Sequence, residues 1–105
     1  MAWIYLILAG LFEIGWPVGL KMAQEDSSRI QGILIAIFFM GISGFLLWLA
    51  QKQIPIGTSY AIWTGIGAAG TFAVGVIFYG DPTSLGRYLG IILIIAGVAT
   101  LKLAH

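Results

Sequence analysis

The chain has 105 residues, of which 60% are hydrophobic and only 9% are charged, against roughly 25% charged residues in soluble domains. Its net charge is +1, so it has no basic patch for a nucleic-acid backbone. Cysteine is absent and the one histidine is His105, which excludes disulfides and leaves no set of ligands for a metal site. These numbers exclude an ordinary soluble enzyme and a disordered tail, and they predict an integral membrane protein.

Four apolar segments are long enough to cross a bilayer as helices, which takes about 20 residues. They cover about residues 3–20, 30–50, 56–79 and 85–103. The polar stretches between them are short, so we expect successive helices to be antiparallel neighbours in a single domain over residues 1–105. The first segment lacks a basic n-region and a cleavage site and has an acid at its centre, so we do not expect a signal peptide.

The basic residues do not favour one side of the membrane. Loops one and three carry Lys21, Arg29 and Arg87, while the other side carries Lys52, Lys102 and the amino terminus. The positive-inside rule needs an excess on one side. Two interpretations stay open: a weak bias fixes one orientation, or the chain inserts both ways and two opposed copies pair.

Size and glycine spacing also favour a dimer. Four helices leave little room for a pathway, and transport sites usually lie between two repeats. The chain has no internal repeat, so two copies would supply the two halves. In the last segment Gly86, Gly90, Gly97 and Thr100 fall close to one stripe, which would let a partner helix approach closely. We expect Gly90 and Gly97 at the dimer interface, although glycine is common in membrane helices generally.

Glu13 is the most informative residue, because it is the one acid inside an apolar segment. A charged group at that depth is costly and normally faces a bundle interior or a wet cavity. Burial disfavours the ionised carboxylate, so this group can hold a proton or a cation but not both comfortably. That competition is the minimum requirement for proton–cation exchange. The alternative is a permanently protonated acid that bonds a neighbouring helix.

The residues around Glu13 are candidates for a binding pocket. Trp16 lies three residues later and shares its helix face. One turn earlier, Ala9 and Gly10 are small, so they leave room either for a ligand or for a packed helix. Pro17 cannot donate to the carbonyl of Glu13 and is expected to kink the helix there.

Two aromatic residues and a serine complete the predicted pocket. Tyr60 and Trp63 are three apart in the third segment, and aromatic faces attract cations. Their alternative role is in the aromatic belt at the membrane surface. Ser43, a lone hydroxyl midway along the second segment, could bond Glu13 or merely its own backbone.

Gly65, Gly67 and Gly70 spell G-x-G-x-x-G, a pattern found in nucleotide-binding loops. That function requires a preceding strand and a βαβ unit, whereas these glycines lie inside an apolar helix. We therefore interpret Gly65 and Gly67 as conformational glycines, at which the third helix could switch between two arrangements.

Three segments closely resemble the small multidrug resistance family of four-helix bacterial exporters: AGLFEIGWPVGLK around Glu13, IPIGTSYAIWTGIGAAG in the third helix and GIILIIAGV in the fourth. The resemblance covers the whole chain. It implies proton-coupled export by an antiparallel, dual-topology homodimer in the bacterial inner membrane, without a cofactor. It also implies that Glu13 is the essential carboxylate, that Tyr60 and Trp63 line the binding site, and that residues 90–98 form the dimer motif.

Within the family, the chain resembles the guanidinium exporters. Trp16, the GLK ending at Lys21 and Ser43 are similar to that branch, whereas the multidrug branch usually has a small residue three positions after the acid. Pro17 departs from the pattern, because alanine is frequent there, so a substituted guanidinium also stays possible as substrate.

Two other functions are considered beside guanidinium/proton antiport. One is a broad exporter of quaternary ammonium and aromatic cations, against which the bulk of Trp16 argues. The other is a structural subunit of a larger membrane complex, in which Glu13 only joins helices. We do not expect an enzyme, because the sequence has no nucleophile–base pair, metal cluster or cofactor motif.

Overall fold

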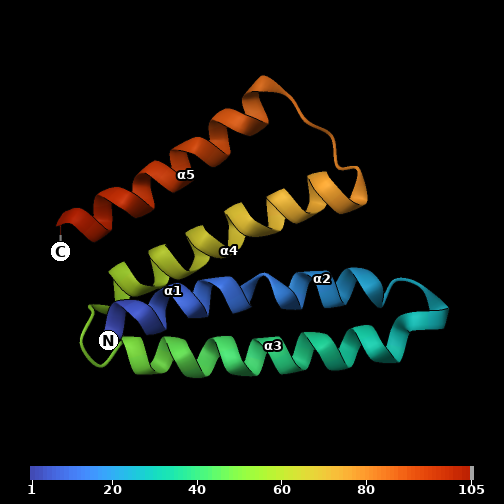
Figure 1. Cartoon of the computed structure of the whole chain (residues 1–105), viewed down its shortest axis with the longest axis horizontal. Coiled ribbons are helices and arrows are strands. Elements are labelled where there is room, and N and C mark those ends of the chain that lie inside the picture. Colours follow the sequence, from blue (N-terminus) through green and yellow to red (C-terminus); the bar gives the residue numbers. More distant parts are fainter. Residues whose placement is uncertain (105) are drawn as a thin grey trace.

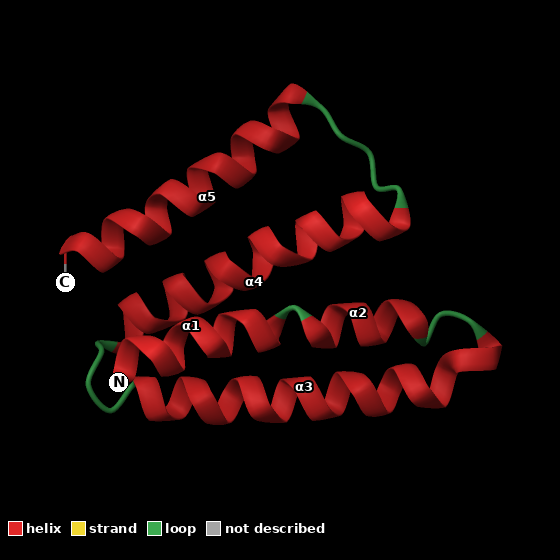
Figure 2. Ribbon diagram, viewed as in Figure 1, coloured by secondary structure: helices red, strands yellow, loops and turns green. Residues whose placement is uncertain are grey.

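The computed structural model describes residues 1–104, so His105 lies outside the described residues. Its regular structure is helical throughout this range (Figure 2). The elements in chain order are α1 (Ala2–Glu13), α2 (Gly15–Met22), the short 3₁₀ helix η1 (Asp26–Ser28), α3 (Arg29–Ala50), α4 (Ile56–Tyr79) and α5 (Leu85–Ala104). They form four helical segments long and apolar enough to cross a membrane, which confirms the predicted all-helical fold with four spans.

The first span is made of two helices, because regular helical bonding is interrupted at Ile14. Pro17 has no N–H for the carbonyl of Glu13 four residues earlier. Ile14 keeps a right-handed backbone (φ −63°, ψ −32°), and its N–H donates to the Leu11 carbonyl at 3.3 Å. The chain therefore tightens for one turn and then continues, and the interruption directly follows Glu13.

The helices pack around α1. Helix α4 packs mainly on α1 and barely touches α3, so the prediction that successive helices are neighbours is wrong for the second and third spans. The α1–α2 span runs antiparallel to α3 along its length, α4 packs across α1, and α5 packs on α4 (Figure 1). A small core of fully buried apolar side chains lies where the start of α1 meets the α3–α4 connection. Its largest members are Leu6, Ile54 and Ile62.

Helix α5 diverges from the rest of the chain (Figure 1). None of its residues is buried, and a Cβ added at Gly90 or Gly97 would meet no atom within 4 Å. The chain measures 45 × 34 × 16 Å, so it is thin, given that one helix with its side chains is about 10–12 Å across. A single copy therefore leaves large apolar helix faces uncovered.

Candidate functional site

Glu13, the last residue of α1, is half-buried against α4. Its side chain lies beside Gly67, where an added Cβ would be only 2.6 Å from the Glu13 Cγ and 3.1 Å from its Cβ. Gly67 therefore makes the space that the acid occupies. This contact gives Gly67 a clear structural task that does not depend on any movement of α4.

The other glycines near Glu13 serve helix packing. Gly65 faces α5, because a Cβ there would collide with Val98. Gly10 faces α4, where a Cβ would lie 2.7 Å from the Cβ of Ile66. Of the two roles considered for Gly10, the structure thus favours close packing of a helix over room for a ligand. Helix α4 itself is continuous through these contacts, from Ile56 to Tyr79.

Ser43 joins three helices through one hydroxyl group. It is fully buried on α3, accepts a hydrogen bond from the indole Nε1 of Trp63 at 2.8 Å and donates to the Ala9 carbonyl at 2.7 Å. The Glu13 Oε1 lies 3.4 Å from the same hydroxyl. A serine hydroxyl has one hydrogen, so at any moment it can donate either to the Ala9 carbonyl or to the Glu13 carboxyl group. The shorter of the two contacts is to Ala9.

Aromatic residues approach this region from two helices. Trp16, on α2, lines the same pocket as Glu13. Trp63 approaches from the Ser43 side, and its ring centroid is 5.4 Å from that of Tyr60, at an interplanar angle of 56°. Tyr60 is 57% exposed, so its ring extends the aromatic surface outward from Trp63.

A cavity of about 270 Å³ opens beside Glu13 between the first span and α4. Trp16 and Pro17 line it from α2, whereas Ser43, Tyr60 and Trp63 do not line it. Of these three residues, Ser43 approaches the carboxyl group directly, and Trp63 is linked to it through Ser43. The α4 wall consists of small residues with a mostly apolar surface, and its members are Thr64, Gly67, Ala68 and Thr71.

Thr64 and Thr71 were not predicted from the sequence as residues of the site. They are three residues before and four residues after Gly67, so all three share one helix face; that spacing was the available signal. The Thr64 hydroxyl donates to the Tyr60 carbonyl at 2.8 Å. Both of its oxygen lone pairs stay free to accept hydrogen bonds.

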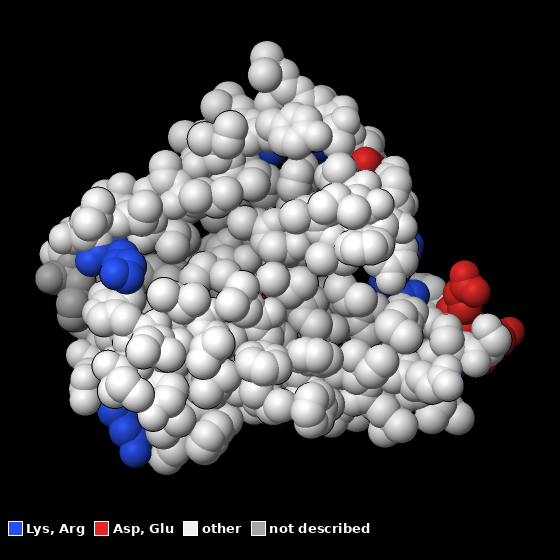
Figure 3. Space-filling view, in the orientation of Figure 1, with Lys and Arg blue, Asp and Glu red and all other residues white. Residues whose placement is uncertain are grey.

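Charged groups are scarce around the cavity. Within residues 1–104 the one ion pair joins Arg29 and Asp26, at 2.7 Å, so Glu13 has no basic partner there. On the face that Figure 3 shows, the charged residues lie around the periphery and a broad uncharged area lies between them. In the same part of the chain no three metal-ligating side chains come together. An ion pair between Glu13 and a basic residue of its own chain is thus excluded for the described residues.

The family model described as Small Multidrug Resistance protein matches residues 1–94. The chain belongs to the small multidrug resistance family. The family resemblance inferred from the sequence is thereby confirmed, and with four helices of spanning length the chain is a multi-pass membrane protein.

Curated relatives match almost end to end. The chain is 48% identical over 104 residues to a guanidinium exporter of Yersinia pseudotuberculosis, with 99% of each chain covered. It is 47% identical to a guanidinium exporter of Salmonella typhimurium, over 99% of this chain and 98% of the relative. It is 45% identical to a guanidinium exporter of Proteus vulgaris, with 99% of each covered.

Proposed function

We propose that this protein exports guanidinium, or small substituted guanidinium cations, in exchange for protons. It would act as an antiparallel, dual-topology homodimer of single four-helix domains in the bacterial inner membrane, with no enzymatic activity and no cofactor. The observation that carries the proposal is Glu13: a carboxyl group in mid-span with no basic partner in the described chain, beside a cavity of about 270 Å³. Three relatives named guanidinium exporter support the choice of substrate.

The groups around the cavity suit a planar cation with many N–H donors. The Glu13 carboxylate can accept two parallel N–H bonds from guanidinium. Thr64 and Thr71 also line the cavity from α4, and their hydroxyl oxygens would be further acceptors for a bound cation. The indole of Trp16 offers a π-face to the cation. A quaternary ammonium ion has no N–H to donate, so these acceptors favour guanidinium over that class.

Glu13 would couple the flux of protons to the flux of guanidinium, because it holds either a proton or the cation. An ionised and unpaired carboxylate is costly inside a membrane, so the empty site favours the protonated acid. A bound guanidinium supplies the positive charge and allows the proton to leave. Ser43 would follow this change, because an ionised carboxylate is a stronger hydrogen-bond acceptor than the neutral Ala9 carbonyl.

Two opposed copies would supply the complete pathway. Helix α5 has no buried residue, and Gly90 and Gly97 leave its surface open for a partner helix. Close approach at such small residues is a common mode of helix association in membranes. If the subunits are antiparallel, the inward- and outward-open states are the same structure seen from opposite faces. Gly65 and Gly67, at contacts of α4, are the positions where we expect α4 to adjust between the two states.

The direct test is proton movement from proteoliposomes on addition of guanidinium. Wild type should exchange and Glu13→Gln should not, while Glu25→Gln, which alters an exposed loop acid, should behave as wild type. Unchanged exchange by Glu13→Gln would contradict the mechanism. Protection against a quaternary ammonium biocide without guanidinium transport would instead indicate the broad-specificity exporter. No transport, together with one fixed orientation, would indicate the structural subunit.

A further inference from the structure

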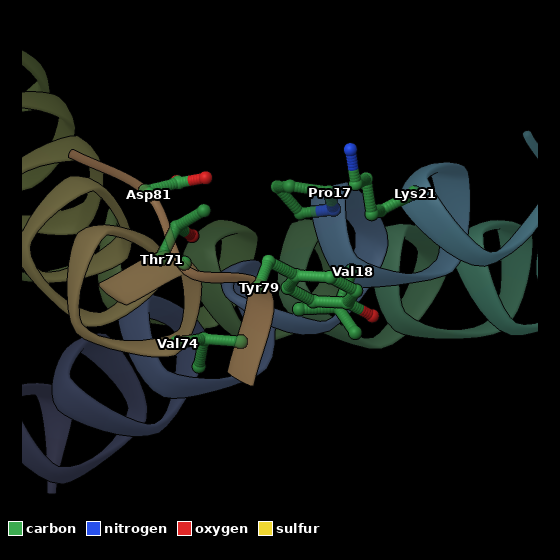
Figure 4. A pocket seen from close by; sticks show the side chains of 8 residues that line it. Pro17, Val18, Lys21, Thr71, Val74, Tyr79 and Asp81 are labelled. Carbon is green, nitrogen blue, oxygen red and sulfur yellow. The ribbon is translucent and has the colours of Figure 1, made fainter. Parts of the chain in front are cut away.

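A second pocket lies beyond the Glu13 cavity, at the end of the molecule where α2 and α4 finish (Figure 4). It has a volume of about 200 Å³. Pro17 and Thr71 line both this pocket and the Glu13 cavity, so the two adjoin along the groove between α2 and α4. Lys21, Tyr79 and Asp81 stand around the rest of this outer pocket.

Two glycines place the Asp81 carboxylate against α4. Gly80 ends the helix with φ 65°, a left-handed conformation that glycine adopts at little cost. The next N–H, that of Asp81, donates to the Gly75 carbonyl at 3.0 Å. The carboxylate then lies over Gly75, where an added Cβ would collide with its Oδ2. Asp81 is thus held over the pocket by the backbone, although it lies in a connection between helices.

The outer pocket has an unpaired anion, Asp81, on one side and a cation that contacts an aromatic ring, Lys21, on the other. The Asp81 carboxylate takes part in no ion pair or side-chain hydrogen bond seen in residues 1–104. The Lys21 Nζ lies 5.7 Å from the centroid of the Tyr79 ring, within the range of a cation–π contact. The pocket therefore contains two groups that can recognise an organic cation, the Asp81 carboxylate and the Tyr79 ring. Lys21 already contacts the ring.

We propose that the outer pocket is a second, weaker binding site for the transported cation, from which the cation passes to Glu13. The arriving cation displaces the Lys21 ammonium from Tyr79 and pairs with Asp81, and Thr71 borders both this pocket and the cavity that receives it next. The identity of the ligand as a guanidinium-class cation rests on the proposed function. In an antiparallel dimer one copy of the pocket would face each side of the membrane.

The proposal predicts opposite effects for two charge-removing variants. Asp81→Asn should lower, and Lys21→Gln should raise, the guanidinium transport rate at subsaturating concentration. Each change should be about two- to fivefold, as expected for an exposed charge interaction, and should be smaller at high salt. The maximal rate should stay unchanged. Lys52→Gln is the matched control, because Lys52 also lies over an indole, that of Trp48 at 4.3 Å, but does not line this pocket.

Binding to the outer pocket can be measured without transport. In a Glu13→Gln background, guanidinium chloride is titrated against the backbone amide NMR signals of Gly80 and Asp81, with sodium chloride as the ionic-strength control. We expect saturable shifts that Asp81→Asn abolishes and Lys21→Gln moves to lower concentration. Absence of guanidinium-specific shifts, or rate effects of the same sign in both variants, would overturn the proposal. Saturable shifts in this background, together with no guanidinium transport by the wild-type protein, would refute the proposed function and leave the outer pocket standing.

Discussion

The contact between Gly67 and Glu13 gives a sharp test of the site. In Gly67→Ala the new Cβ would lie 2.6 Å from the Glu13 Cγ and 3.1 Å from its Cβ. These atoms are near the backbone, so the acid must change its rotamer or α4 must move away. Overpacking of this kind typically costs about 1–3 kcal/mol. If the bound state bears about 1.4 kcal/mol of that cost, guanidinium affinity falls about tenfold.

Gly57→Ala is the matched control for this variant. It is the same substitution on the same helix, but the added Cβ meets no atom within 4 Å. Guanidinium affinity and proton-coupled flux are measured for both purified variants, and size-exclusion chromatography checks that each stays monodisperse. We expect a loss of about tenfold for Gly67→Ala and wild-type behaviour for Gly57→Ala. Equal guanidinium affinity in the two variants would refute the assignment of Gly67 as the space for Glu13.

Three further predictions concern the surroundings of Glu13. Ser43→Ala leaves the Trp63 Nε1 without its acceptor and should weaken guanidinium binding by about three- to tenfold. If titration calorimetry shows no change in guanidinium affinity or in its pH dependence, Ser43 is not part of the site. Pro17→Ala restores a donor for the Glu13 carbonyl and should alter the ratio of transport rates for guanidinium and methylguanidinium. Identical ratios in the variant and in wild type would contradict this prediction. The Cβ added in Gly65→Ala would collide with Val98, so this variant should lower the free energy of unfolding in detergent by about 1–3 kcal/mol. An unchanged unfolding temperature would show that α5 adjusts without cost.

The sequence was sufficient to predict the spans and the central acid. Apolar runs of spanning length can be recognised from the sequence alone, because the thickness of a bilayer sets the length that a helix needs to cross it. Glu13 stands out for the same reason, as a charged residue within such a run. The break after Glu13 was also predictable, since the missing N–H of Pro17 is a local covalent property.

The contacts of the site could not be predicted in this way, because they depend on how helices face one another. The sequence indicated Ser43 as a partner of Glu13, but not that its shorter bonds go to Ala9 and Trp63. Thr64 and Thr71 became candidates only when α4 was seen against the first span. The pairing of subunits through α5 stays a prediction, because it needs a second copy of the chain.

In the proposed mechanism one carboxyl group, that of Glu13, holds a proton and the guanidinium cation in turn. The most direct measurement is proton release on guanidinium binding by the purified protein in weakly buffered detergent solution. It is followed with a pH-indicator dye at a series of pH values. We expect wild type to release protons as guanidinium binds, its affinity for guanidinium to weaken as the pH falls, and Glu13→Gln to release no protons. Guanidinium binding by wild type with equal affinity at every pH and without proton release would contradict this mechanism.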